Sequence, residues 1–553
     1  MKKKLGLVSA IVLMLSLLLS ACGFSNSKTD EKEAPEGVEK TESQETKKEK
    51  VVNLSLANDI PDLNQVLTTD GISFTVLNNV MEGLYRLDEN NEPQPAMAES
   101  VDISEDKLTY TFHLRDGIKW SNGDPVTAED FKYSWLRAMH ADTSGAYADI
   151  LYNYIAGGEE FFEGEADASA VAIDAKDEKT LEVKIKSPSP FFLGLTAFAT
   201  YFPLNEKFIT EIGDDKFALK ADAILYNGPY VMTEYNQAQG VSLEKNPEYW
   251  DKENVDVDKV SLKVIKEQST ALNLYEAGEL DRVYLASSDV DSYRDSAEFG
   301  TETEFISWFL QFNHNTAPFD NLNIRKAFQL AFDPQILTKT ILNNGSEPAY
   351  GLVAAGVHGD DGKTFREVNG DLIQPDYDKA KEFLAKGIAE IGKLPSIEIL
   401  TADDTIAKDT ATFLQSEFKK NIGVDVQIST KPYSGRLDAM RASEFQMGIS
   451  KWGADYNDAM DILSLWIGDP PKGLRGNYSS EEYKQYINDA GDEKDVAKRL
   501  QMLMDAEKLM IQEDGALGPL YFEGKAFLQK SNLKNFVTHP YGASIDLKFL
   551  TLE

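Results

Sequence analysis

Residues 109–135 read TYTFHLRDGIKWSNGDPVTAEDFKYSW. Apolar side chains alternate with polar ones in the first part of this stretch, at Tyr110, Phe112 and Leu114, which is the pattern of a half-buried strand. The Ser-Asn-Gly-Asp run at 121–124 then predicts a turn. The stretch therefore begins with a strand that ends before that turn.

A helix is predicted directly after the turn. Thr127 precedes Asp130 by three residues, close to a capping box, and Val126 and Phe131 are spaced as a hydrophobic staple. Phe131, Trp135 and Met139 then recur every four residues, which places them on one buried face.

A second pattern, farther along the chain, is typical of a β-α-β unit. Alternating strands are expected at 397–399 and 424–428, with a helix between them whose apolar positions run from Ala407 to Phe418. A further alternating strand is expected at 445–449. Since parallel sheets place ligands beyond the carboxyl ends of their strands, the following segment, 451–456, is the candidate site.

Composition limits the classes of protein that need considering. A length of 553 residues predicts roughly three domains, and 42% hydrophobic residues predict a globular fold rather than disorder. The net charge of −36 repels phosphate backbones, so no nucleic-acid partner is expected.

The single cysteine, Cys22, follows an N-terminal stretch that is typical of an export signal. Three lysines precede an apolar run of about 15 residues, which is shorter than a membrane span. Leu19-Ser20-Ala21-Cys22 resembles the bacterial lipoprotein box, which implies a signal peptide over 1–21 and a lipid on Cys22. An uncleaved anchor and a secreted protein without lipid remain alternatives. Residues 22–50 are polar and charged, and predict a disordered tether.

Residues for enzymatic or metal chemistry form no recognisable motif. The five histidines are dispersed, and Gly362-Lys363-Thr364 lacks the glycine that a phosphate-binding loop needs at position 357. Neighbouring carboxylates such as Asp403 and Asp404 are expected in solvent, although pairs that meet only in the fold remain open. We therefore expect neither a cofactor nor a metal, and no enzymatic activity.

Six dispersed segments resemble the oligopeptide-binding family of extracytoplasmic solute-binding proteins of ABC transporters. The stretch 109–135 matches the family's signature region. The others, in family order, are Met81–Tyr85, Asn227–Tyr230, Asn246–Trp250, Pro318–Phe328 and Trp452–Asp458. The likeness runs from about Val51 to the C-terminus.

The resemblance implies an α/β fold of the periplasmic-binding-protein type, class II, a three-domain clamshell with mixed sheets flanked by helices. The implied domain I comprises 51–83, 188–312 and 521–553, domain II comprises 84–187, and domain III comprises 313–520. Hinges are expected near residues 312 and 520. Trp120 and Trp135 are expected in the core rather than at the ligand.

The resemblance also implies peptide-binding residues. Asp455 matches the aspartate that pairs with the ligand's α-ammonium, and a buried ammonium requires such a partner. Trp452 would wall a side-chain pocket, Tyr147 would face the ligand, and segments with Lys451 and Gly453 would pair with the peptide backbone. Ala286 and Ser287 match a second such segment.

Ligand and partners follow from the same resemblance. The expected ligand is an oligopeptide, the expected partners are the transmembrane subunits of an ABC permease, and the expected location is the outer face of the cell membrane, with Cys22 as lipid anchor. We expect a monomer. No arginine lies between Arg441 and Trp452 to meet a short peptide's carboxylate, so the ligand length stays open. Alternatives are a dipeptide, nickel or oligosaccharide receptor, and a chaperone or a receptor for peptide pheromones.

Overall fold

The strand and the helix predicted from residues 109–135 are both present. The computed structural model describes residues 49–143, 145, 147–360, 362–467 and 475–553. Strand β5 spans Thr109–Leu114 and helix α2 spans Ala128–Met139. The Thr127 backbone N–H donates to the Asp130 carboxylate at 2.8 Å, which confirms the predicted helix start.

Helix α2 is held by its apolar face. Phe131, Trp135 and Met139 are fully buried, and Trp120 is 1% exposed. The Trp135 indole N–H donates to the Tyr201 carbonyl at 2.7 Å, so its one polar group is satisfied inside the core. Both tryptophans are core residues, as expected.

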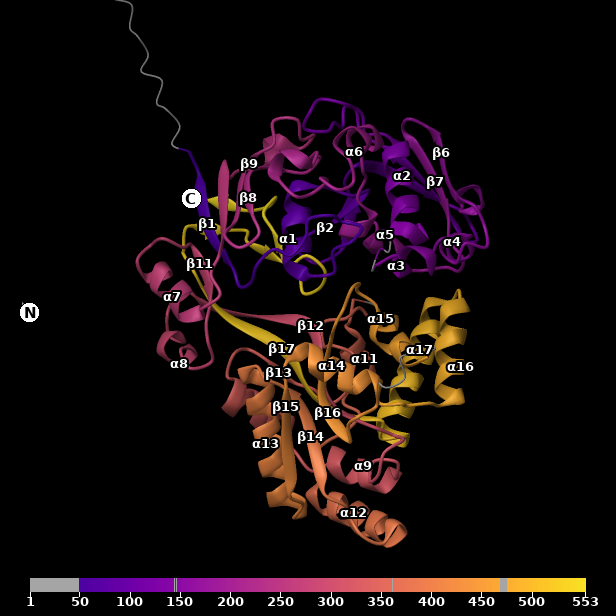
Figure 1. The fold of residues 1–553 in the computed structure, drawn as a ribbon, viewed down its shortest axis with the longest axis vertical. Coiled ribbons are helices and arrows are strands. Elements are labelled where there is room, and N and C mark those ends of the chain that lie inside the picture. The colour runs from indigo at the N-terminus through magenta and orange to yellow at the C-terminus, as the bar shows by residue number, and fades with distance from the viewer. Residues whose placement is uncertain (1–48, 144, 146, 361, 468–474) are drawn as a thin grey trace, which may run out of the picture. The chain divides into compact units, whose positions relative to one another are not determined.

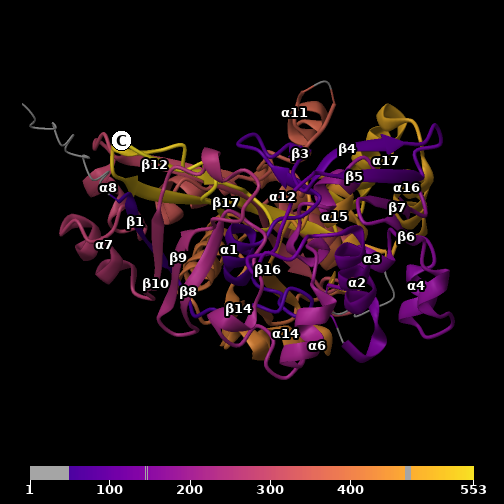
Figure 2. The same ribbon diagram turned by 90° about the horizontal axis from the view of Figure 1, so that it is seen from above.

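Strand β5 belongs to a four-stranded antiparallel sheet of order β4-β5-β7-β6. The other strands are β4 (Ala98–Ile103), β6 (Ile173–Asp177) and β7 (Thr180–Lys184). Helix α2 contacts β6 and β7, and both views show it beside them (Figures 1 and 2).

A second four-stranded sheet joins the start of the described chain to its middle. Its order is β1-β10-β9-β8, with β1 parallel to β10 and the other pairs antiparallel. The strands are β1 (Val51–Leu56), β8 (Tyr230–Asn236), β9 (Gly240–Lys245) and β10 (Lys259–Val264). Residues about 200 positions apart thus share one sheet.

The largest sheet has seven strands in the order β11-β17-β12-β16-β14-β15, with β13 paired to β17. Its members are β11 (Arg282–Tyr284), β12 (Phe299–Phe312), β13 (Glu347–Pro348), β14 (Ile397–Ala402), β15 (Val426–Lys431), β16 (Met447–Gly453) and β17 (Leu517–Gln529). Strands β12 and β17 pair antiparallel over most of their length, with two register shifts (Figure 1). Parallel and antiparallel neighbours together make this a mixed sheet, as predicted.

The predicted β-α-β unit is confirmed by β14, helix α13 (Thr405–Ile422) and β15, with β14 parallel to β15 and to β16. The end of the next strand was predicted wrongly. Strand β16 does not stop at Ile449 but continues through Gly453, because it pairs with β12 from Met447 to Gly453. Lys451, Trp452 and Gly453 are therefore strand residues.

Helices cover the sheets and fill the ends between them. The longer ones are α1 (Gly71–Val80), α7 (Gln268–Glu276), α9 (Leu322–Gln329), α12 (Tyr377–Ile391), α14 (Tyr433–Arg441), α16 (Glu481–Asp492) and α17 (Val496–Lys508). The shorter ones are α3 (Asp149–Tyr152), α4 (Gly158–Phe162), α5 (Phe192–Leu195), α6 (Glu206–Ile212), α8 (Val290–Tyr293), α10 (Pro334–Ile336), α11 (Phe365–Asn369) and α15 (Ala459–Leu463). Small two-stranded pairs are β2 (Tyr85–Leu87) with β3 (Pro93–Pro95), β18 (Leu533–Lys534) with β21 (Thr551–Leu552), and β19 (Val537–Thr538) with β20 (Ile545–Asp546).

A buried ion pair fixes the C-terminal segment against the N-terminal part of the fold. The Arg86 guanidinium donates two hydrogen bonds to Asp546, both at 2.8 Å, and both side chains are at most 5% exposed. Burial opposes ionisation of Asp546, but Arg86 and His539 hold its pKa well below the usual range. This pair anchors the loop at 538–544, which lines the site described below.

The predicted signal peptide (1–21), Cys22 and most of the predicted tether (22–50) lie outside the described residues. Within the described ranges, no helix is both long and apolar enough to cross a membrane. Residues 49–553 form one compact unit.

Candidate functional site

The site begins where β16 leaves the seven-stranded sheet. Gly453 pairs with Ile306 of β12, and the Ala454 backbone N–H donates to the Phe305 carbonyl at 2.9 Å. Asp455 follows, and its own backbone N–H donates to the Asp461 carboxylate at 3.3 Å. The aspartate is thus held at the end of a paired strand, on a turn closed by a second acid.

Asp461 ties this turn together from the first turn of α15. Its carboxylate also accepts the Trp452 indole N–H at 2.9 Å, and the residue is 6% exposed. Burial and the nearby Asp455 keep the pKa of Asp461 well above its usual range. Trp452 is half-buried and packs against the core that contains α15. Its indole therefore helps to hold the turn that carries Asp455.

Tyr147 meets Asp455 from a segment 308 positions away. Its hydroxyl donates to the Asp455 carboxylate at 2.9 Å. The tyrosine ring packs against Phe74 and Phe198, each with a centroid distance of 5.6 Å, which sets the direction of the hydroxyl. Two residues predicted for the ligand site therefore lie in contact.

A cavity of about 350 Å³ opens beside this pair; we call it the Asp455 compartment. Four of the predicted site residues line it: Tyr147, Lys451, Gly453 and Asp455. The rest of its wall comes from α1 and the loop before it, Phe198, Ala454, strands β12 and β17, and the loop at 538–544; the chemically distinctive members are Glu304, Ile306, Glu523, Lys525, His539 and Tyr541.

The environment of the Asp455 carboxylate favours the binding of a cation. Burial raises its pKa to about 7; the Tyr147 hydrogen bond opposes this shift and the nearby Asp149 adds to it. Among the described residues no ion pair involves Asp455, and its carboxylate accepts only from Tyr147. A positively charged ligand group placed there would give this carboxylate the cationic partner that the described residues do not supply.

Lys451 already has a partner. Its ammonium donates to the Glu523 carboxylate at 3.3 Å and lies 4.8 Å from the centre of the Trp308 ring. The Trp308 indole N–H donates to the same glutamate oxygen at 2.7 Å. Lys451 therefore lines the Asp455 compartment as half of an ion pair.

Ala286 and Ser287 are not brought together with the others. They follow β11 and are half-buried, and the Leu285 N–H donates to the Ala526 carbonyl at 2.9 Å. This bond places them beside β17, next to Lys525, but neither residue is among those that line the compartment.

The next residue of the turn adds a second bridge between distant segments. The Tyr456 hydroxyl lies 2.9 Å from that of Tyr154, and its ring stacks on Phe191 with a centroid distance of 4.3 Å. Asp458 instead forms a two-pronged ion pair with Arg499, both bonds at 2.8 Å. Of the two aspartates that flank Tyr456 in the Trp452–Asp458 segment, only Asp455 faces the compartment.

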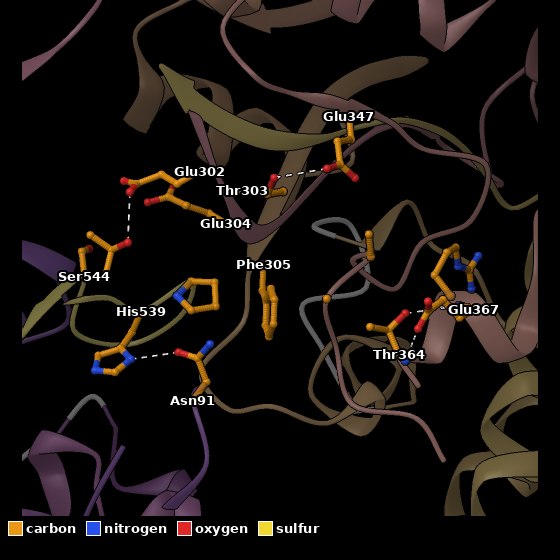
Figure 3. Close-up of a pocket in the computed structure, with 15 residues that line it drawn as sticks. Asn91, Glu302, Thr303, Glu304, Phe305, Glu347, Thr364, Glu367, His539 and Ser544 are labelled. Atoms are coloured by element: carbon orange, nitrogen blue, oxygen red, sulfur yellow. Dashed lines mark hydrogen bonds between the residues drawn. The ribbon is translucent and has the colours of Figure 1, made fainter. Parts of the chain in front are cut away.

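A larger cavity, about 640 Å³, adjoins the first and is drawn in Figure 3; we call it the Glu347 compartment. It shares Glu304, His539, Pro540 and Ser544 with the Asp455 compartment. Its other walls come from β12, β13, Asn91, Thr538 and five residues before and within the start of α11: Ala355, Gly356, Thr364, Arg366 and Glu367. No local sequence pattern marks these residues, because their strands meet only in the folded sheet.

The family model, the relatives and the solved structures that this chain matches all point to one family. The family model described as bacterial extracellular solute-binding proteins, family 5, matches residues 92–473. The chain is 36% identical to the dipeptide-binding protein DppE of Bacillus subtilis over 91% of this chain and 92% of that protein. It is 33% identical to the oligopeptide-binding protein OppA of the same organism, over 97% of each. Among solved structures, Listeria monocytogenes OppA bound to peptide superimposes with a TM-score of 0.77 at 34% identity, covering 92% of this chain and 99% of that one.

Proposed function

This chain belongs to the bacterial extracellular solute-binding proteins of family 5, and from that premise we propose that it captures peptides outside the cytoplasm and delivers them to an ABC permease. The observation that carries peptide binding is the Asp455 carboxylate. It faces a cavity, accepts the Tyr147 hydroxyl, and has no cation partner among the described residues.

A peptide supplies the missing cation. Its α-amino group has a pKa of about 8 and is mostly protonated at neutral pH. An ammonium that leaves water needs a carboxylate beside it, whereas an uncharged sugar does not. Asp455, oriented by Tyr147 and by the Asp461 turn, provides that carboxylate, and the receptor performs no chemistry on the peptide.

Binding would couple two parts of the chain. Tyr147 comes from the proposed domain II (84–187) and Asp455 from domain III (313–520), while domain I comprises 51–83, 188–312 and 521–553. The sheets support the separation of domain II, because β4 to β7 all lie within 84–187, whereas β14 to β16 of domain III share one sheet with β11, β12 and β17. A ligand that contacts both Tyr147 and Asp455 stabilises the closed arrangement, and β12 and β17 carry the hinges near 312 and 520. The permease recognises the closed receptor, which acts as a monomer.

Calorimetry tests the proposed function. The full chain, unfolded and refolded to remove carried-over ligand, is titrated with peptides of two to nine residues, each in a free and an N-acetylated form. We expect heat of binding with the free amines and much weaker binding with the acetylated partners. If no free peptide binds, the ligand is another solute.

We further propose that the receptor is held at the membrane by a lipid on Cys22. This assignment rests on the Leu19-Ser20-Ala21-Cys22 sequence and on the extracellular family. The Cys22→Ala variant is expected to move from the membrane pellet to the soluble fraction, because it lacks the sulfur that would carry the lipid. Fractionation of cells, followed by immunoblotting, measures this. A variant that still pellets with membranes would contradict the lipid anchor.

A further inference from the structure

The Glu347 compartment carries an excess of negative charge. Four glutamates line it, from β12, β13 and α11: Glu302, Glu304, Glu347 and Glu367. Figure 3 shows them spread around the cavity, with Glu302 and Glu304 on one side, Glu347 above and Glu367 opposite. Their placement on separate elements means that a ligand in the cavity meets carboxylates from several directions.

Two of the four carboxylates are neutralised within the protein. Glu302 pairs with Arg282 at 2.5 Å, and Glu304 pairs with Lys525. Both glutamates also lie on β12, two positions apart, so their side chains share one face of the strand.

The other two have only neutral partners among the described residues. Glu347 accepts the Thr303 hydroxyl at 3.4 Å, and Glu367 accepts the Thr364 backbone N–H at 2.8 Å. Both glutamates are exposed, and no described lysine, arginine or histidine forms an ion pair with either.

The basic side chains in the cavity wall do not neutralise the Glu347 and Glu367 carboxylates. The Arg366 guanidinium pairs with the fully buried Glu507, and the Asn369 amide donates to the same carboxylate at 2.6 Å. One ring nitrogen of His539 lies 2.9 Å from the Asn91 amide oxygen, and the other lies 3.7 Å from Asp546. Glu347 and Glu367 thus leave the compartment with a negative charge that a ligand can meet.

An aromatic wall stands between these carboxylates. Phe305 lines the compartment and stacks on Tyr541, with ring centres 5.6 Å apart and planes 21° apart. A lysine or arginine side chain suits such a place, because its aliphatic stem packs on a ring while its charged head remains near carboxylates and water.

The compartment also lies within reach of a peptide held at Asp455. The Ala454 backbone N–H is hydrogen-bonded to the Phe305 carbonyl. Glu302 lies three residues before Phe305 on β12, which is a distance of about 10 Å at about 3.3 Å per residue. An extended peptide with its amine at Asp455 would cover that distance in about three residues. Since Glu304, His539, Pro540 and Ser544 belong to both walls, the two compartments are direct neighbours.

We propose that the Glu347 compartment selects peptides with a lysine or arginine side chain several residues after the N-terminus, and that Glu347 and Glu367 are the residues that determine this preference. The inference rests on the proposed peptide-receptor function and names the class of peptide that the receptor prefers.

Calorimetry with a position scan tests the preference. Hexa-alanine is compared with peptides that carry lysine, norleucine or glutamate at each of positions 2 to 6. We expect lysine to bind about tenfold more tightly than its uncharged analogue norleucine at one or more positions from 3 onward, with glutamate weakest, and the ratio to fall at high salt.

Three variants locate the effect. Glu347→Gln combined with Glu367→Gln is expected to abolish the lysine preference while hexa-alanine affinity stays within about twofold, and glutamine retains the capping bond of α11. Glu347→Lys is expected to shift the preference toward glutamate. Glu382→Gln combined with Asp378→Asn, two exposed sites on α12 outside the cavity wall, changes net charge by the same two units and is expected to leave the preference intact.

The outcomes separate the two proposals. Binding of hexa-alanine without any lysine preference would overturn this inference and leave the peptide receptor standing. A preference that survives in the double glutamine variant would also overturn it. Absence of binding by every peptide would reject the receptor function, and the inference with it.

Discussion

The Asp455→Ala variant is expected to bind free-amine peptides about a hundredfold or more weakly than the unaltered chain. Removal of one partner from a buried ion pair typically costs about 3–5 kcal/mol, because the other charge is left without compensation, and about 2.7 kcal/mol already corresponds to a hundredfold. Among the described residues, the Tyr147 hydroxyl donates to Asp455 and to no other carboxylate. Calorimetry with paired free and N-acetylated peptides measures the loss.

Acetylation makes this prediction specific to the amine. An N-acetylated peptide has no ammonium to lose, so its weak affinity is expected to be nearly equal for the two proteins. The matched control is Asp378→Ala, an exposed aspartate on α12, which is expected to change nothing. Thermal unfolding of each variant shows whether the fold is retained. Unchanged affinity of Asp455→Ala for free peptides would remove Asp455 from the binding site.

Local structure was largely predictable from the sequence, because each local pattern has a short-range physical cause. Alternation at Tyr110, Phe112 and Leu114 gave strand β5, and the Thr127–Asp130 spacing gave the start of α2. The β-α-β unit at 397–431 followed from the same kind of evidence. These patterns depend on neighbours within a few residues and on which face is buried.

The end of β16 was not predictable in this way. Lys451, Trp452 and Gly453 break the apolar alternation, yet they are strand residues because β12 pairs with them. A polar residue such as Lys451 can occupy that position because its ammonium meets Glu523 in the open cavity wall. Tertiary pairing here outweighs the local pattern.

The residues of the site were predictable only in part. The resemblance to oligopeptide-binding proteins pointed to Asp455 and Tyr147, which the structure places in contact. It did not point to Glu347 or Glu367, which lie on a two-residue strand and a five-residue helix without distinctive spacing. Their proximity depends on how β13 pairs with β17 and on how α11 comes to line the same cavity as β12, and neither is encoded in a short pattern.

The balance of charge shows why the two compartments have different roles. In the Asp455 compartment Glu304 and Glu523 are each paired with a lysine of the same wall, which leaves Asp455 as its uncompensated carboxylate among the described residues. In the Glu347 compartment the uncompensated carboxylates are exposed and have room around them. A tight, partly buried aspartate suits one fixed group, the ammonium that all free peptides share, whereas a roomy acidic cavity suits a side chain that varies among peptides.

Peptide affinity is expected to depend on pH with a maximum between about pH 7 and pH 8. Burial raises the pKa of Asp455 to about 7, and Tyr147 and Asp149 modify that value. Below pH 7 the aspartate is protonated, and a peptide ammonium must displace that proton in order to pair with it. Above about pH 8 the α-amino group of the peptide loses its own charge. Between pH 7.5 and pH 5.5 the ionised fraction of a group with pKa 7 falls on the order of twentyfold, and the affinity is expected to fall with it.

The same pKa fixes the sign of a stability effect in the free receptor. The unfolded chain ionises Asp455 at about pH 4, whereas the folded chain keeps it protonated to about pH 7. Within that window the folded state binds the extra proton, so this group stabilises the fold at low pH and its contribution is lost as pH rises from 4 to 7. Peptide binding and folding therefore respond to pH in opposite directions through this one carboxylate.

Titrations at pH 6 in buffers of different ionisation enthalpy should detect release of nearly one proton per peptide bound, and Asp455→Ala should release none. Equal affinities at pH 5.5 and 7.5, without proton release, would mean that Asp455 is already ionised when the peptide arrives.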